Sequence, residues 1–173
     1  MAVSEGSFEF EAFFEAHYER IARSIARIVG DPARAEDLAA EAFWRLWRHP
    51  KAQGAYAGGW VYRTAVRLAL NHLREGRRRS QYEAERVAPQ TGPETPEQAH
   101  AAAEERHQVR RVLAMLDERQ AELLLLRTSG LSYEELAAAM DLNPASVGTF
   151  LNRAQQAFRK EYLRQYGRKG SGR

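Results

Sequence analysis

The sequence predicts an all-α protein made of two small helical domains joined by a flexible linker, with a helix-turn-helix in the second domain. Alanine, leucine, arginine and glutamate dominate the 173 residues, and no segment sustains the alternation of apolar and polar residues that marks a strand. Segment 88–96 has three prolines and no large apolar residue, so it cannot bury enough surface to offset its ordering entropy. We expect an N-terminal domain at 8–80, an acidic, proline-containing linker at 81–103, a C-terminal domain at 104–166 and a disordered tail at 167–173.

The composition excludes several classes of protein. The chain has no cysteine, which rules out disulfides, thiolate metal sites and thiol nucleophiles. Its N-terminus is acidic and lacks the apolar core of a secretion signal. The longest purely aliphatic run, 123–126, is far too short to cross a bilayer. We therefore expect a cytoplasmic protein without direct membrane insertion.

Charge is unevenly distributed along the chain. Residues 51–80 carry seven basic and one acidic side chain, whereas residues 81–106 carry two basic and six acidic ones. The C-terminal part is basic again, so two basic regions flank an acidic one. This pattern favours two contacts with a polyanion. The alternative is that the charges only solvate helix faces.

The first two predicted helices span 8–29 and 33–48, separated by a glycine that can end one helix and a proline that can start the next. In the second helix, Leu38, Ala42 and Leu46 form a buried stripe. Asp37, Glu41 and Trp44 lie on another face, at i, i+4 and i+7. A tryptophan among carboxylates can anchor a protein partner, or it can pack under a neighbouring helix, and both interpretations stay open.

The third predicted helix, 60–79, has two contrasting sides. A helical projection groups its apolar residues on one broad arc: Val61, Tyr62, Ala65, Val66, Leu68, Ala69 and Leu73. The opposite side, the basic stripe, consists of Trp60, Arg63, Arg67, Asn71, Arg74 and Arg78. Arginines can neutralise phosphates, an amide can read a base edge, and an aromatic ring can stack on an unpaired base. The stripe therefore predicts contact with nucleic acid. His72 falls on the buried arc and is expected to be a core histidine.

The C-terminal domain is expected to begin with helices at 104–116 and around 123–126. Ser132 and Glu135 have the spacing of a capping box, and the helix they start should stop near residue 140. Asp141 can adopt a left-handed turn, after which Asn143 can cap a second helix with Pro144 at its first position. A short helix, a tight turn and a second helix predict a helix-turn-helix.

The second helix of this motif should expose residues suited to a DNA groove. Its predicted outer side carries Ser146, Thr149, Arg153, Gln156 and Lys160, types that contact base edges and phosphates. A plain helical hairpin, whose second helix only packs, is the alternative.

These motifs, taken in order, resemble the extracytoplasmic-function (ECF) sigma factors of the sigma-70 family. The resemblance covers roughly 10–75 and 107–162. It lies in 35–47, in 60–74, and in 130–137 together with 146–154. Ala40, Arg67 and Asn71, with Gly148 and Phe150, differ from residues common in the family, and these differences bear on the promoter sequence more than on the class.

The resemblance implies a protein that directs promoter recognition by core RNA polymerase, with no catalytic residue, metal or cofactor. Asp37, Glu41 and Trp44 would dock on the polymerase clamp. The basic stripe would line the promoter −10 element, beside a loop at 51–59 holding an unstacked base. Another set would read the −35 element: Ser146, Thr149, Phe150, Arg153 and Gln156. The acidic linker would thread toward the RNA path. Such proteins are commonly held by an anti-sigma partner, and the lack of cysteine implies that any signal enters through that partner.

Two other classes are weighed against this one. A stand-alone helix-turn-helix regulator would bind duplex DNA as a dimer and would not need the basic stripe. An enzyme such as a small hydrolase would need a catalytic constellation, but the five histidines are scattered without metal spacing or a paired nucleophile, and no glycine-rich phosphate loop is present.

Overall fold

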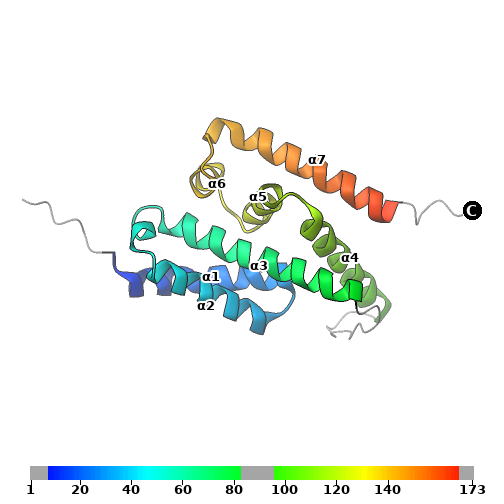
Figure 1. Cartoon of the computed structure of the whole chain (residues 1–173), viewed down its shortest axis with the longest axis horizontal. Helices are drawn as coiled ribbons and strands as arrows, with labels where there is room; N and C mark the ends of the chain where they lie inside the picture. The colour runs from blue at the N-terminus through cyan, green and yellow to red at the C-terminus, as the bar shows by residue number, and fades with distance from the viewer. Residues whose placement is uncertain (1–7, 83–95, 168–173) are drawn as a thin grey trace, which may run out of the picture.

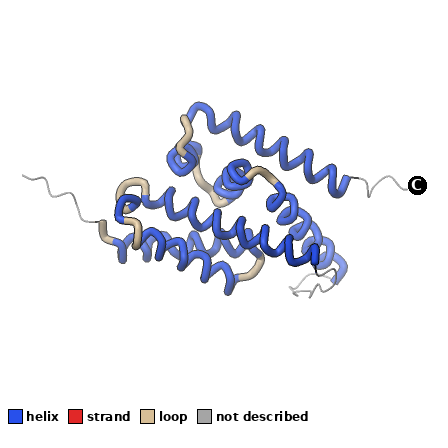
Figure 2. Tube along the Cα trace, viewed as in Figure 1, coloured by secondary structure: helices blue, strands red, loops and turns tan. Residues whose placement is uncertain are grey.

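The structure is a computed structural model that describes residues 8–82 and 96–167. This part of the chain is helical and contains no strand (Figure 2). Its elements, in chain order, are α1 (Phe10–Val29), α2 (Pro32–Trp47), the 3₁₀ turn η1 (Pro50–Ala52), α3 (Ala57–Tyr82), α4 (Pro96–Met115), α5 (Glu118–Thr128), α6 (Tyr133–Met140), the 3₁₀ turn η2 (Pro144–Ser146) and α7 (Val147–Tyr166). The prediction of an all-α protein is confirmed.

The predicted turn between the first two helices is present. Gly30 has a φ of 74°, and its N–H donates to the carbonyl of Ala26. A side chain at this left-handed position would be strained. Asp31 then accepts a hydrogen bond from the backbone N–H of Arg34, with Pro32 at the first helical position. These caps turn α2 back against α1, its main packing partner.

Helices α1, α2 and α3 enclose the core of the N-terminal half. Large side chains from all three are completely buried, among them Ile21, Phe43, Leu46 and Val61. A polar pair also lies inside this core, where the hydroxyls of Ser24 and Tyr62 are 2.8 Å apart. The pair satisfies both groups, which would otherwise be costly to bury.

The C-terminal half has the helix-turn-helix that the sequence predicts. Ser132 and Glu135 form the complete capping box at the start of α6. Asp141 ends α6 with a φ of 53°, and the side chain of Asn143 accepts from the N–H of Ala145. The second helix differs slightly from the prediction. Pro144 starts a 3₁₀ turn, and the α-helix itself begins at Val147.

Helix α4 begins earlier than predicted. We expected it to start near residue 104, but it runs from Pro96. The reason is local: proline is favoured at a helix start, and the alanines before Glu104 have the highest helix propensity. Residues 96–103 of the predicted linker are therefore helical. Residues 83–95, and 168–173 of the predicted tail, lie outside the described residues.

The two halves lie side by side, with α3 between them (Figure 1). On one side α3 packs against α1 and α2, and on the other it contacts α4, α5 and α6. We call this second boundary the seam. Helix α7 lies on the outer side of the C-terminal half, against α5 and α4. No helix in the described ranges is long and apolar enough to span a membrane.

Candidate polymerase and nucleic-acid interfaces

Helix α2 presents an exposed acidic and aromatic face. Trp44 is 53% exposed, so it does not pack under a neighbouring helix, as one of the two sequence interpretations would have required. Asp37 is exposed beside it, and Glu41 accepts a hydrogen bond from Nε of Arg45 at 3.1 Å. The guanidinium of Arg48 lies 4.8 Å from the Trp44 ring centre. These contacts hold the face in a defined arrangement.

Trp47, which the sequence analysis did not single out, enlarges this aromatic surface. It is 60% exposed. With Trp44 it borders a groove of about 270 Å³, and the other lining residues are Phe10, Phe14, Ala40 and Phe43. The missed signal is the i, i+3 spacing of the two tryptophans, which brings both to one edge of α2.

Helix α3 has the two sides that the sequence predicts. Six of the seven arc residues are buried, and Leu73 is partly buried. His72 is also only partly buried, rather than a full core residue. Burial lowers the pKa of its imidazole below the usual value, and the charge of Arg34 lowers it further.

The basic stripe is divided between solvent and the seam. Asn71 and Arg78 are exposed. Arg63, Arg67 and Arg74 instead turn toward the C-terminal half. The guanidinium of Arg74 donates to the carbonyl of Leu116 at 3.1 Å. The stripe therefore exists as a helix face, but three of its four arginines have partners inside the protein.

A single carboxylate holds the other two arginines. Nε of Arg63 lies 3.0 Å from Oε2 of Glu122, and Nε of Arg67 donates to Oε1 of the same carboxylate. Arg63 also donates through Nη1 to the carbonyl of Ala139, at 3.3 Å. Glu122 has an exposed fraction of 0%. The sequence analysis missed it, and the signal was a lone acid in the otherwise apolar run of α5.

Trp60 and the loop before it are firmly held. The Trp60 ring stacks on His49, with ring centres 5.7 Å apart and an interplanar angle of 10°. The amide of Gln53 donates to the carbonyls of Leu46 and Trp47, which ties the loop to the end of α2. Tyr56, which sequence reasoning did not single out, is 76% exposed at the loop tip. An exposed ring on a fixed loop can stack on an unpaired base.

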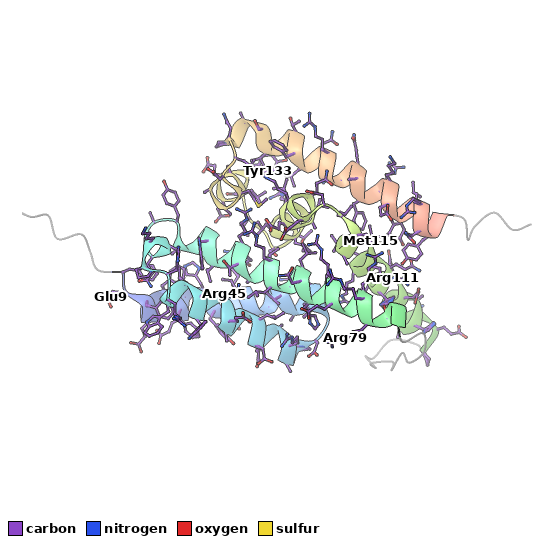
Figure 3. All side chains as sticks on the ribbon, viewed as in Figure 1. Glu9, Arg45, Arg79, Arg111, Met115 and Tyr133 are labelled. Atoms are coloured by element: carbon purple, nitrogen blue, oxygen red, sulfur yellow. The ribbon has the colours of Figure 1, made fainter. Side chains whose placement is uncertain are left out.

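A polar groove of about 520 Å³ runs beside the stripe. Its walls come from α2, α3, α5 and α6, and they include Arg45, Trp60, Thr64 and Asn71. Figure 3 shows Arg45 projecting on the α2 side. A groove with cationic, aromatic and amide groups on its walls has the chemistry that binds a single strand.

The outer side of α7 matches most of the prediction for the second helix of the helix-turn-helix. Thr149, Phe150, Arg153 and Gln156 are exposed, whereas Ser146 is only partly so. The guanidinium of Arg153 lies 6.0 Å from the Phe150 ring centre. Side chains project from α7 away from the other helices (Figure 3). Nothing in the described part of the chain covers this surface.

The described residues contain no group of three or more histidine, aspartate and glutamate side chains placed to hold a metal ion. Three surfaces make up the candidate site: an acidic and aromatic face on α2, a basic and aromatic stripe on α3, and an exposed helix of a helix-turn-helix.

Comparison with known proteins identifies the class of protein to which this set of surfaces belongs. The profile for Sigma-70 region 2 matches residues 13–79, and that for Sigma-70 region 4 matches residues 106–157. The chain therefore belongs to the sigma-70 family of RNA polymerase sigma factors, in its ECF group. It is a promoter-recognition factor for transcription initiation, and the stand-alone regulator is the less favoured interpretation.

Individual relatives support this assignment along most of the chain. The RNA polymerase sigma-H factor of Pseudomonas aeruginosa is 32% identical over 166 residues, which cover 87% of this chain and 84% of that protein. The ECF sigma factor SigL of Mycobacterium tuberculosis is 26% identical over 152 residues, or 86% and 85% of the two chains. Sigma factor RpoE of Bartonella quintana, solved with the anti-sigma factor NepR, has a similar fold. Its TM-score is 0.52 at 17% identity, over 88% of this chain and 96% of that one.

Proposed function

We propose that Asp37, Glu41 and Trp44 form the surface that docks on core RNA polymerase, and that Trp47 belongs to it. The observation that carries this proposal is the exposure of both tryptophans on one edge of a rigid helix. Exposed tryptophans are costly to leave in water and are enriched at the centres of protein interfaces. The carboxylates beside them supply charge for a basic partner.

For the −10 element, we propose the basic stripe of Trp60, Arg63, Arg67, Asn71, Arg74 and Arg78, together with Tyr56. The arginines would neutralise phosphates and position the strand, and Asn71 would read a base edge. Tyr56 and Trp60 flank the start of α3, where a ring can stack on a base that has left the duplex. The groove beside the stripe supports this assignment, because Arg45, Trp60 and Asn71 place cationic, aromatic and amide groups on its walls.

For the −35 element, we propose the outer side of α7, with Ser146, Thr149, Phe150, Arg153 and Gln156. The exposed second helix of a helix-turn-helix enters the major groove with its N-terminal residues at the bases. Thr149, Arg153 and Gln156 lie in its first three turns. Arg153 supplies the charge there, because Ala145 and Gly148 supply none.

An anti-sigma partner is part of the proposal. The sigma factor RpoE of Bartonella quintana was solved with its anti-sigma factor, and a comparable protein would control this one. The chain has no cysteine to sense redox state, so a signal would act through the partner. We place the protein in the cytoplasm with core polymerase, acting without catalysis of its own.

Capture of purified bacterial core polymerase on the tagged protein tests the docking surface. The wild type should retain core, and the Asp37→Ala/Trp44→Ala variant should lose most of it. A matched control is Glu104→Ala/Leu163→Ala, which also removes one exposed acid and one exposed apolar side chain. Equal retention by all three proteins would refute the proposed surface, and no retention by the wild type would refute its docking role altogether.

A further inference from the structure

The arginines that face promoter DNA in the proposed function already have anionic and carbonyl partners. Arg63 and Arg67 donate their Nε–H groups to the two oxygens of Glu122. Arg74 donates to the carbonyl of Leu116. A guanidinium N–H aimed at one acceptor cannot bind a second in the same place. Phosphate and Glu122 therefore compete for the same donors.

The burial of the Glu122 carboxylate is not explained by its surroundings within the C-terminal half. Glu122 is the only buried charged residue in the described part of the chain, and the residues directly before and after it on α5, Ala121 and Leu123, are apolar. Removing a carboxylate from water is strongly unfavourable unless paired charges and hydrogen bonds compensate. Both compensating charges come from α3, across the seam. The carboxylate is thus stable in this position only while the two halves remain together.

The other two proposed interfaces stay open in this arrangement. The principal contacts of α2 are with α1, α3 and η1, and Trp44 and Trp47 are exposed. The outer side of α7 is exposed as well. Closure therefore engages Arg63, Arg67 and Arg74 of the basic stripe and leaves the polymerase-docking surface available.

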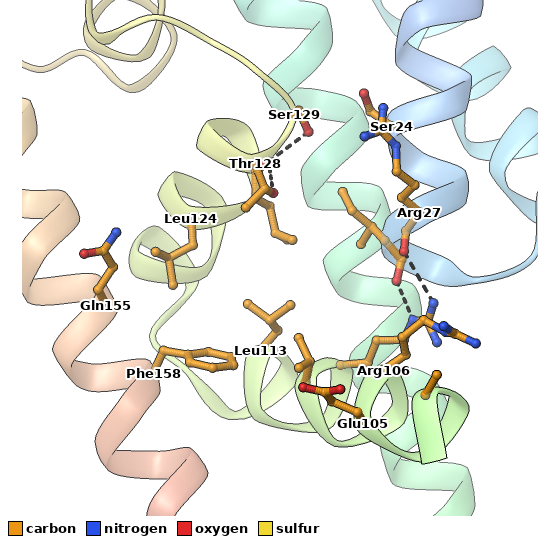
Figure 4. A pocket seen from close by; sticks show the side chains of 15 residues that line it. Ser24, Arg27, Glu105, Arg106, Leu113, Leu124, Thr128, Ser129, Gln155 and Phe158 are labelled. Carbon is orange, nitrogen blue, oxygen red and sulfur yellow. Dashed lines mark hydrogen bonds between the residues drawn. The ribbon is translucent and has the colours of Figure 1, made fainter. Parts of the chain in front are cut away.

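A second contact between the halves joins α1 and α4. An open pocket of about 640 Å³ lies beside this contact and is lined by α1, α4, α5 and α7 (Figure 4). Beside it, Arg110 donates to the carbonyls of Ile28 and Arg27. Hydrogen bonds from arginines therefore contribute to this contact as well as to the seam.

We propose that Glu122 acts as an internal substitute for a promoter phosphate and holds the free protein closed, so that the seam arginines of the basic stripe, Arg63, Arg67 and Arg74, are released only when the seam opens. This proposal rests on the assignment of the stripe to DNA. Docking on core through α2 can precede opening, because that surface is accessible in the closed form. A stripe available in only a small fraction of molecules lowers the apparent DNA affinity by that fraction.

A distance measurement between the halves tests the closing role of Glu122. Because the chain has no cysteine, Ala16→Cys on α1 and Asn152→Cys on α7, both exposed, can be spin-labelled specifically for pulsed EPR. Glu122→Gln removes the charge at nearly constant shape and should shift the distribution to longer distances. Glu134→Gln, an exposed acid on α6, is the matched control and should not. An unchanged distribution for Glu122→Gln overturns the proposal.

Binding to a fluorescent single-stranded DNA 20-mer, without polymerase, tests the masking. Glu122→Gln should bind roughly tenfold or more tightly than the wild type, and Glu134→Gln should match the wild type. Opening without a gain in affinity overturns the masking. Core capture is a separate measurement, so loss of the docking function and failure of this inference are distinguishable.

If Glu122→Gln fails to fold, a reversible disulfide across the seam tests the same proposal. A Cβ placed on Gly59 would lie 3.3 Å from Cβ of Ala139, across the seam, close to the ~3.5–4.5 Å of disulfides. Oxidised Gly59→Cys/Ala139→Cys should bind the 20-mer several-fold more weakly than the same protein after reduction. Equal binding in the two states would contradict the proposal.

Discussion

Nε of Arg63 lies 3.0 Å from Oε2 of Glu122, an ion pair between residues 59 positions apart in the chain. The two partners are unequally buried, because the side chain of Glu122 is fully buried whereas those of Arg63 and Arg67 are 25% and 48% exposed. This difference in burial decides which partner of the ion pair can be removed with the smaller loss of stability. An arginine left alone can return to water, but the carboxylate cannot without moving α5.

Substitutions on the two sides of this ion pair should therefore have unequal effects on stability. Arg63→Ala/Arg67→Ala strands a buried carboxylate and should lower the free energy of unfolding by about 3 kcal/mol or more. Glu122→Leu replaces the carboxylate with an apolar group of similar size and should change it by less than about 1.5 kcal/mol. Urea unfolding followed by circular dichroism measures both. Equal losses would argue against the described burial of Glu122.

The buried hydroxyl pair of Ser24 and Tyr62 gives a second stability prediction. Tyr62→Phe leaves the Ser24 hydroxyl without its partner and should cost about 1–2 kcal/mol. Ser24→Ala should cost a similar amount. The double variant leaves no orphan and should cost clearly less than the sum of the single variants. Additive losses in chemical unfolding would show that the hydroxyls do not interact.

His72 should make stability depend on pH. Burial, and then the charge of Arg34, lower the pKa of its imidazole in the folded protein, while Glu75 and Asp31 oppose part of the shift. The unfolded chain therefore binds a proton more readily than the folded one. The stabilising contribution is complete above the unfolded pKa of about 6.5, and it is lost as the pH falls below that value. The thermal midpoint should drop between pH 7.5 and 5.

His72→Gln isolates this contribution from the others. The drop should be smaller in that variant, but it should not vanish. Burial also lowers the pKa of His17, so His17 contributes in the same direction. His100→Gln, an exposed position on α4, is the control and should behave as the wild type. Identical pH profiles for all three proteins would contradict the assignment to His72.

Local signals made much of the fold predictable. Gly30, the capping box of Ser132 and Glu135, and the left-handed Asp141 act through neighbours within four residues, so the sequence displays them directly. The periodicity of α3 likewise sorted buried from polar positions. The early start of α4 at Pro96 was missed because three prolines were interpreted together as a linker, although the last of them precedes an alanine-rich segment that favours a helix.

The seam could not be predicted in the same way. A helical projection shows that Arg63, Arg67 and Arg74 share a face, but it does not show what covers that face. Their partners, Glu122 and the carbonyl of Leu116, come from another domain. A pairing of that kind depends on tertiary packing, which periodicity does not encode. Glu122, the one acid within the apolar segment 121–126 of α5, indicated only that some cation had to pair with it.

DNA contacts made by α7, the second helix of the helix-turn-helix, should appear in the salt dependence of promoter binding. If Arg153 pairs with a phosphate, Arg153→Ala should weaken promoter binding by the holoenzyme and reduce the slope of log K against log salt by about one. Arg164→Ala removes an arginine that pairs with Glu161 at the far end of α7 and should leave the slope unchanged. Equal slopes for both variants would remove Arg153 from the interface.

Transcription from fragmented genomic DNA of the source organism tests the promoter-recognition function most directly. Core polymerase is incubated with the template, with and without the purified protein, and the 5′ ends of the transcripts are sequenced. The protein should produce discrete start sites whose upstream DNA shares two sequence blocks, near −10 and −35. The same set of 5′ ends with core alone as with the protein added would contradict the assignment of this chain as a promoter-recognition factor.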